Sequence, residues 1–300
     1  MLSELGGANM VLSEIFFLQY QNALTNTGPS NLMLFTAVAV GLVGFYIIIR
    51  YNVKDSPIFI PGLVKLTNDY RMILEKKFTY YQRLSPENKR QFEKRVHLFI
   101  NSKIFIPRRF KKVTMEMKTM VAASAVQLTF GFQALTMPHF TRILIYPDSY
   151  YSSIRKTYHK GEVNPSARLI VFSWKGFLEG YEDNSDSSNL GLHEMAHALK
   201  LENKIFNNEV GFLDPILYHK WEVLATKHVA RLKTEEDPLF RKYAAENEYE
   251  FFAVAVENFF ERPFLFQKIH PELFELLKGL LNQDPIAIQQ LEPEEEGQNS

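Results

Sequence analysis

Hydrophobic residues recur at helical spacing through much of the chain beyond residue 70. Ser85 and Pro86 begin one predicted helix, because serine is a favoured N-cap and proline suits the first helical position. This pattern continues to about Ser102. Further helices are predicted at residues 113–130, from about Asn189 through GLHEMAHALK, and at residues 215–233, 238–261 and 271–282.

Two short runs predict β-strands. TRILIY, residues 141–146, and RLIVFSW, residues 168–174, are rich in β-branched and aromatic side chains, and the breakers Pro147 and Gly176 follow them. Helices with a few interspersed strands predict an α+β fold, a mostly helical domain with a small β-sheet over residues 70–290. The acidic residues 291–300 are predicted to form a disordered tail.

The N-terminal region has a different pattern. Residues 32–49 read LMLFTAVAVGLVGFYIII without a charge, and at about 1.5 Å per residue a helix over residues 31–49 nearly spans a bilayer core. A buried core helix is the alternative, and a cleaved signal peptide fits poorly because no Lys or Arg precedes the run. We therefore predict one transmembrane helix within residues 1–50, followed by a linker over residues 51–69.

Basic residues predict the orientation of this helix. Residues 1–49 contain none, whereas Arg50, Lys54 and Lys65 follow the apolar run closely. By the positive-inside rule, the N-terminus lies outside and the main domain lies in the cytoplasm of a single-pass membrane protein.

Composition narrows the possible chemistry. Lys plus Arg equals Asp plus Glu at 34 each, so no overall charge points to a nucleic-acid partner. Cysteine is absent, so a metal site would need histidine and carboxylate ligands.

The sequence GLHEMAHALK, residues 191–200, contains the spacing of a metal site. On a helix, His193 and His197 lie on one face one turn apart, where both imidazoles can bind one ion. Glu194 is rotated away from that ion but can reach a water molecule bound to it. This arrangement is typical of zinc-dependent hydrolysis, with Glu194 as the general base.

The third ligand must come from elsewhere in the chain. Lys200 and Asn203 occupy the positions where a metzincin has glycine and its third histidine, so that class is excluded. The distant candidates are Glu209, His219, Glu222, His228, Glu250 and Glu257.

Residues 243–260, YAAENEYEFFAVAVENFF, carry carboxylates within a strongly apolar segment. The 4-3-4 spacing of Glu246, Glu250, Ala253 and Glu257 places these four residues on one helical stripe. Such a stripe is commonly solvated. A helix that buries its other faces, however, favours inward carboxylates only when a cation pairs with them.

Several segments together resemble the Mlc titration factor A (MtfA) peptidases, whose active site is similar to that of anthrax lethal factor. The matching segments are MVAASAVQL, RILIYPDSY, LIVFSWKGF, NLGLHEMAHAL, YAAENEYEFFAVAVENFFERP and LLNQDP. The resemblance implies a zincin-like fold and one zinc ion (Zn2+) per chain. It further implies His193, His197 and Glu250 as ligands, Glu194 as the catalytic base and Tyr243 as hydrogen-bond donor to the oxyanion.

Glu257 is predicted to accept a hydrogen bond from a ligating imidazole. The sequence thus favours a membrane-anchored zinc metallopeptidase that cleaves a peptide or protein substrate, with aminopeptidase-like activity implied by the family. RLIVFSW is expected to be the strand along which an extended substrate pairs. The alternative is a regulatory binding module that sequesters a partner such as a transcriptional repressor, with zinc mainly structural. No residues of this sequence indicate a repressor-binding surface.

Overall fold

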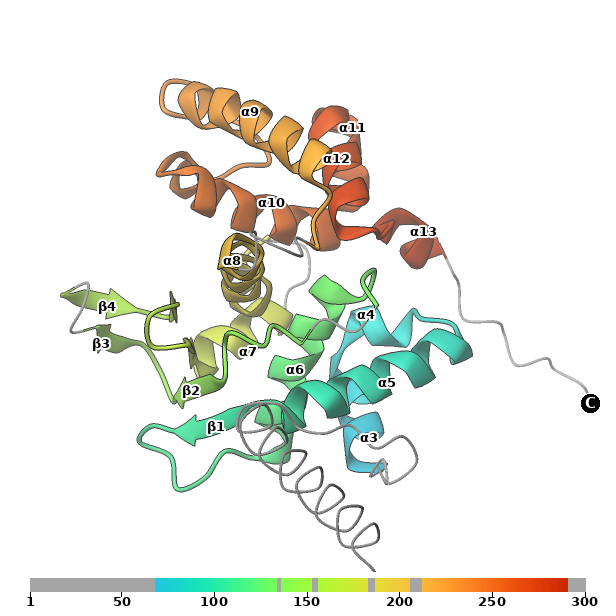
Figure 1. The fold of residues 1–300 in the computed structure, drawn as a ribbon, viewed down its shortest axis with the longest axis vertical. Coiled ribbons are helices and arrows are strands. Elements are labelled where there is room, and N and C mark those ends of the chain that lie inside the picture. Colours follow the sequence, from blue (N-terminus) through green and yellow to red (C-terminus); the bar gives the residue numbers. More distant parts are fainter. Residues whose placement is uncertain (1–67, 134–135, 153–155, 183–186, 206–211, 291–300) are drawn as a thin grey trace, which may run out of the picture. The chain divides into compact units, whose positions relative to one another are not determined.

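Four strands form one mixed sheet in the order β1-β2-β6-β5. Strands β1 (Ile104–Pro107), β2 (Arg142–Tyr146) and β6 (Leu169–Ser173) are parallel, and β5 (Gly161–Asn164) is antiparallel to β6. A separate two-stranded hairpin consists of β3 (Tyr150–Ser152) and β4 (Thr157–His159). The computed structural model describes residues 68–133, 136–152, 156–182, 187–205 and 212–290 (Figure 1).

Helices make up most of the described chain, which confirms the α+β prediction. The N-terminal part contains α3 (Asn68–Lys77), α4 (Thr79–Gln82), α5 (Pro86–Asn101) and α6 (Met115–Thr129). Helices α7 (Trp174–Glu182) and α8 (Leu190–Ile205) follow the sheet. The C-terminal part contains α9 (Pro215–Leu232), the 3₁₀ turn η1 (Lys242–Ala245), α10 (Glu248–Glu261), α11 (Pro263–Ile269), α12 (Pro271–Leu281) and α13 (Pro285–Gln290).

Side-chain caps explain why these helices begin where they do. Ser85 accepts a hydrogen bond from the backbone N–H of Asn88 at the start of α5, as the sequence predicts. Thr114 caps α6 in the same way. Helix α6 is buried almost all round, because α3, α5 and α8 pack against it.

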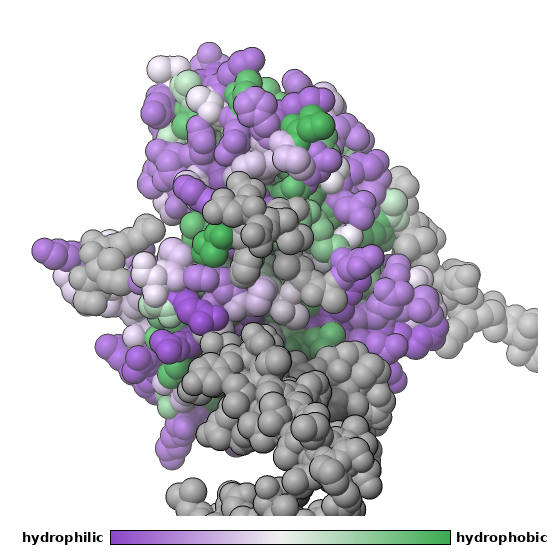
Figure 2. Space-filling view, in the orientation of Figure 1, coloured by the Kyte–Doolittle hydropathy of each residue, from purple (hydrophilic) through white to green (hydrophobic). Residues whose placement is uncertain are grey.

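Helix α8 lies at the centre of the described residues. It packs against α6 on one side and against α10 on another, and it also contacts β5 and β6 (Figure 1). Most of its side chains are buried, including Leu192, Met195, Ala196 and Leu199. The apolar residues around the two histidines therefore anchor this helix in the hydrophobic core, and the polar ones face a cleft. The C-terminal helices α9–α12 present a mostly hydrophilic surface on the face shown in Figure 2.

Two details of the sequence interpretation are wrong. RLIVFSW forms β6, which lies between β2 and β5 and so has no free edge for a substrate. The edge strand is β5, whose sequence GEVN was not predicted because only Val163 is strongly hydrophobic. The helix expected over residues 238–261 begins only at Glu248, because Asn247 caps it and η1 precedes it. Glu246 is therefore not on the stripe with Glu250 and Glu257.

Predictions for the N-terminal 67 residues and the acidic tail concern residues outside those that the structure describes. Within residues 68–290, no described helix is both long and apolar enough to cross a membrane.

Candidate metal centre and catalytic cleft

Two helices bring the three predicted ligands together. His193 and His197 lie one turn apart on α8, and Glu250 lies in the first turn of α10. Asn247 determines this position, since its side-chain oxygen accepts the backbone N–H groups of Tyr249 and Glu250 at 2.9 and 3.0 Å. Asn189 similarly accepts the N–H of Leu192 at 3.0 Å at the start of α8.

The ligand atoms of the three side chains form a small triangle. His193 Nε2 lies 3.1 Å from His197 Nε2 and 3.1 Å from Glu250 Oε2, and His197 Nε2 lies 3.3 Å from the same carboxylate oxygen. Two ligand bonds of about 2.0–2.1 Å at a tetrahedral angle separate their donor atoms by about 3.3 Å. The triangle therefore has the dimensions of three corners of a tetrahedral zinc site. Among the described residues, these three side chains form a group that could hold a metal ion.

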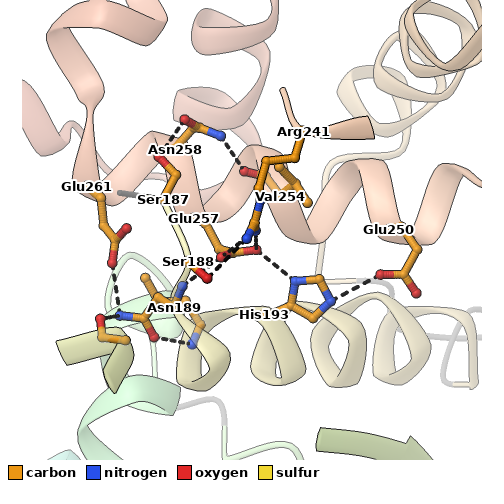
Figure 3. A network of polar contacts seen from close by, with 12 residues as sticks. Ser187, Ser188, Asn189, His193, Arg241, Glu250, Val254, Glu257, Asn258 and Glu261 are labelled. Carbon is orange, nitrogen blue, oxygen red and sulfur yellow. Dashed lines mark hydrogen bonds and ion pairs between the residues drawn. The ribbon is translucent and has the colours of Figure 1, made fainter. Parts of the chain in front are cut away.

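Glu257 orients the first histidine (Figure 3). His193 Nδ1 donates a hydrogen bond of 2.7 Å to Glu257 Oε1, and the Glu257 side chain is 1% exposed. In a neutral ring with its proton on Nδ1, Nε2 is an acceptor, so its lone pair points toward Glu250 and His197. This is the arrangement in which a metal-binding imidazole is held by a neighbouring carboxylate.

Without a cation, these acceptor atoms would repel one another. Burial alone would lower the pKa of His193, but the hydrogen bonds to Glu250 and Glu257 outweigh it and raise that pKa to about 10. Burial would raise the pKa of Glu250, yet hydrogen bonds from His193 and His197 hold it well below its usual range. Both pKa shifts have the same cause: a positive charge between the three groups is favourable. A proton or a metal ion can supply that charge. Two histidines and one carboxylate are a set that suits Zn²⁺.

A polar network stabilises the Glu257 carboxylate away from water (Figure 3). The guanidinium of Arg241 donates to both carboxylate oxygens at 3.1 Å, and the backbone N–H of Asn189 donates to Oε2 at 2.7 Å. Arg241 also donates to Ser188 at 3.1 Å. Each lone-pair direction of this buried carboxylate thus has a donor, which removes the penalty of burying its charge.

Glu194 faces strand β5 across a cleft. Its side chain is buried, and a Cβ built on Gly161 would lie 2.3 Å from its Oε1. Two adjoining cavities of about 480 and 320 Å³ meet here. Their shared lining residues are His159, Gly161, His193, Glu194 and Tyr243. The general-base candidate and the metal-ligand triangle therefore open onto the same space as the sheet edge.

Tyr243 reaches the site from η1 rather than from α10. Its ring centroid lies 5.9 Å from that of His193, and 44% of the residue is exposed. The break between η1 and α10 supplies the bend that a straight helix lacks, since seven helical residues would separate Tyr243 from Glu250 by about 10 Å. Burial and the nearby Glu250 carboxylate raise the pKa of Tyr243 above its ordinary value, so the phenol keeps its proton near neutral pH.

The structure thus brings every site residue predicted from the sequence to one place and adds others that the sequence analysis missed. His159 lines both cavities, although it was not among the predicted site residues. Gly161 and Arg241 could not be predicted from the sequence. Gly161 lies in a strand without a hydrophobic pattern, and Arg241 lies in a polar loop. Of the other ligand candidates, His228 does not join the ligand triangle and packs against Phe251 and His270. Glu209 lies outside the described residues.

Comparisons with known proteins place similarities to this chain over most of the described domain. A family of proteins described as glucose-regulated metallo-peptidase M90 matches residues 63–281. An uncharacterised protein of Synechocystis sp., slr2042, is 26% identical over 232 residues, which cover 72% of this chain and 84% of the relative. Mlc titration factor A of Yersinia pestis is 25% identical over 223 residues, which cover 68% of this chain and 82% of the relative. The corresponding protein of Yersinia pseudotuberculosis matches to the same extent.

Proposed function

The chain belongs to the glucose-regulated metallo-peptidase M90 family, with Mlc titration factor A among its relatives, and on this basis we propose that it is a zinc-dependent peptidase anchored to a membrane. The family membership confirms the resemblance seen in the sequence. The observation that carries the zinc proposal is the triangle of His193, His197 and Glu250, with sides of 3.1–3.3 Å. Its dimensions match those of a tetrahedral ion with one position left for water.

The proposed mechanism uses two further side chains. When bound, zinc polarises a water molecule and the scissile carbonyl, and it lowers the pKa of that water to about 7. Glu194 takes the proton of the attacking water and later returns it to the leaving amine. Tyr243 donates its hydroxyl hydrogen to the carbonyl oxygen as negative charge develops there. Glu257 keeps the proton of His193 on Nδ1 throughout.

Strand β5 is the proposed guide for the substrate. It is the edge strand on the cleft side of the sheet, and Gly161 brings its backbone close to Glu194. An extended peptide can pair with the free backbone groups of such an edge. Because glycine lacks a side chain, the peptide can approach the catalytic carboxylate closely at this point.

The smaller cavity supports aminopeptidase-like action. Glu162 and Glu246 line it, and no Lys or Arg of the described residues forms an ion pair with either carboxylate. Two uncompensated carboxylates beside the reaction centre favour a positively charged group such as the free amino terminus of a peptide.

Membrane anchoring rests on the sequence. Residues 32–49 are uncharged and Arg50, Lys54 and Lys65 follow them, which supports one membrane-spanning helix and a catalytic domain on the cytoplasmic side. The alternative function is a binding module with structural zinc. Such a module would not require Glu194 beside the metal-ligand triangle, so the residues of the cleft favour the peptidase over the binding module.

Substitution of the base tests the proposed function directly. Glu194→Gln should retain one zinc per chain and lose hydrolysis of peptide substrates by about 10²- to 10⁴-fold, the usual contribution of a general base. Glu250→Ala should lose the zinc. Zinc content is measured by elemental analysis of the purified full chain, and hydrolysis with a fluorogenic peptide library. Unchanged hydrolysis by the zinc-loaded Glu194→Gln protein would refute the mechanism, and a wild type without zinc would refute the metal site.

The amine preference has its own test. Glu246→Gln should lower kcat/KM for peptides with a free amino terminus by about 10- to 100-fold, the range expected for a charge-assisted hydrogen bond. Rates for N-acetylated peptides should stay the same. Glu248→Gln is the matched control, because Glu248 contacts Thr226 and does not line the cavity. An equal effect on both substrate classes would contradict amine recognition while leaving the peptidase proposal intact.

A further inference from the structure

The loop between β1 and α6 concentrates positive charge. Residues 108–112 read RRFKK, and the four basic side chains, Arg108, Arg109, Lys111 and Lys112, are all exposed. None of the four has an ion pair with a carboxylate of the described residues. Exposed lysines elsewhere, such as Lys220 and Lys268, also lack an ion pair with the described residues, but neither has a Lys or Arg next to it in the sequence. The loop is therefore a concentrated and uncompensated cationic surface.

Apolar side chains border this basic loop. Met115 at the start of α6 is 39% exposed, and Ile104, at the opposite end of β1 from the loop, is 61% exposed. Phe110 lies within the loop and is partly buried against the core. Cationic groups next to exposed apolar side chains are the composition of surfaces that bind anionic bilayers, where the cations meet lipid headgroups and the apolar groups enter the interface.

The position of the basic loop also suits a membrane. It follows β1, which is at one edge of the four-stranded sheet, whereas β5 and the cleft are at the other edge. Three interstrand spacings of about 4.8 Å separate the two edges by about 14 Å. In Figure 1 the loop after β1 lies on the far side of the sheet from α8 and α10. A bilayer against the loop would leave the cleft open to substrate.

The first described helix, α3, ends close to the basic loop. An ion pair between Lys77, at the end of α3, and Glu116, in the first turn of α6, places α3 beside the end of the loop. Eighteen residues, 50–67, separate the apolar run from Asn68. Fully extended they reach at most about 60 Å, so an anchor at residues 32–49 would hold the start of α3 within that distance of the bilayer.

We propose that the basic loop, residues 108–112 with Ile104 and Met115, docks on anionic lipid headgroups and holds the catalytic domain against the membrane with its cleft facing away. The proposal goes beyond the peptidase function and does not depend on it. It uses the proposed anchor only to bring the loop to the bilayer. Each basic residue near an anionic surface strengthens attachment about fivefold, so four should shift the docking equilibrium on the order of 10²- to 10³-fold.

A fluorescent reporter beside the loop tests docking in the full chain. Because the chain has no cysteine, Met115→Cys gives one site for an environment-sensitive dye. The labelled protein is placed in nanodiscs of phosphatidylcholine alone or with about one-third phosphatidylglycerol. We expect brighter, blue-shifted emission only in the anionic discs, reversed by about 0.5 M NaCl, since salt screens these contacts.

Matched charge variants complete the experiment. Arg108, Arg109, Lys111 and Lys112→Gln together should abolish the emission change and leave hydrolysis of a soluble peptide unaltered. The control changes four exposed lysines on α9–α11 to Gln and should keep the emission change: Lys220, Lys227, Lys233 and Lys268. Equal emission in neutral and anionic discs, or equal loss in both variants, would overturn the proposal. A response to polyuridylate but not to lipid would overturn it in favour of a nucleic-acid site.

Discussion

At the scale of single residues, the candidate centre depends on one carboxylate that is not among the proposed metal ligands. Glu257 accepts the Nδ1 proton of His193 and is itself held by Arg241 and by the backbone of Asn189. Because it selects the tautomer, it determines whether Nε2 presents a lone pair or a proton to the metal position. A loop residue, Arg241, thereby influences a helix residue through a third side chain.

Glu257→Gln should weaken zinc binding by about 10- to 100-fold, the usual effect of removing the carboxylate behind a ligating histidine. The amide has the same shape but also presents an N–H₂ group, which competes with the Nδ1 proton. Affinity is measured by competition with a chelator of known zinc affinity. Glu261→Gln is the control, since Glu261 lies on the same helix and accepts a hydrogen bond from the Asn189 side chain rather than from a proposed ligand. Unaltered zinc affinity in Glu257→Gln would show that the tautomer needs no such support.

Tyr243→Phe should lower kcat by about 10²- to 10³-fold, as expected when one donor to a developing oxyanion is removed. The ring is retained and the residue is partly exposed, so the fold and the zinc content should not change. Single-turnover kinetics separates this effect from substrate binding. A rise in KM with constant kcat would mean that Tyr243 binds substrate without stabilising the oxyanion.

At the scale of elements, the cleft exists because a short strand passes close to a helix. Strand β5 has four residues, and it is antiparallel to the neighbouring β6 whereas the rest of the sheet is parallel. Its first residue is glycine, directly beside the Glu194 carboxylate. Any side chain at this position would have to displace either the strand or the base.

Gly161→Ala should therefore reduce activity by about 100-fold, because a displacement of about 1 Å in a catalytic group has that effect. Zinc content should stay at the wild-type level, since the three atoms nearest to the added methyl group all belong to Glu194 and not to a proposed ligand. Gly176→Ala is the matched control in the larger cavity, where the nearest atoms belong to movable side chains at 3.1–3.4 Å. Full activity of Gly161→Ala would contradict this prediction, because it would show that β5 and Glu194 can move apart without affecting hydrolysis.

At the scale of the whole described domain, a second buried polar cluster joins α9, the loop before η1 and the start of α12. Asp237 accepts hydrogen bonds from Arg231, from His270 and from the backbone of Leu239. His228 packs on Phe251, and its Nδ1 lies 3.4 Å from Arg231. This cluster anchors one end of the loop whose other end carries Arg241 and Tyr243.

Stability should fall in mild acid because of His228. Burial, together with the charges of Arg231 and His270, lowers the pKa of His228 from 6.5 to about 4. Between these values the unfolded chain binds a proton that the folded chain does not. The stabilisation is therefore complete above pH 6.5 and is lost as pH falls to 4. Allowing for partial exposure, we expect a loss of about 1–2 kcal/mol from this residue.

Urea unfolding at pH 7, 5.5 and 4 measures this effect. In His228→Gln the free energy of unfolding should decrease less between pH 7 and pH 4, by about 1–2 kcal/mol. His219 lies on the exposed face of the same helix, so His219→Gln should show the same pH dependence as the wild type. A pH dependence identical in His228→Gln and wild type would assign the acid sensitivity to other groups.

The sequence by itself determined what local spacing and local capping can determine. The i, i+4 histidines, the adjacent Glu194, the Ser85 cap and the long apolar helices follow from periods of a few residues. Glu250 as a metal ligand needed the family resemblance, because several other carboxylates and histidines were compatible with the spacing alone. The predicted membrane helix likewise rests on a local run of apolar residues.

Only the tertiary structure decided which distant residues share the site. Strand β5 is too short and too polar to be recognised locally, and it becomes a strand because β6 supplies its hydrogen-bond partners. Tyr243 reaches the centre because Asn247 starts α10 late, and His159 and Arg241 come from segments without a periodic pattern. Their positions depend on long-range packing against α8, where burial and hydrogen-bond satisfaction, rather than local spacing, select the arrangement.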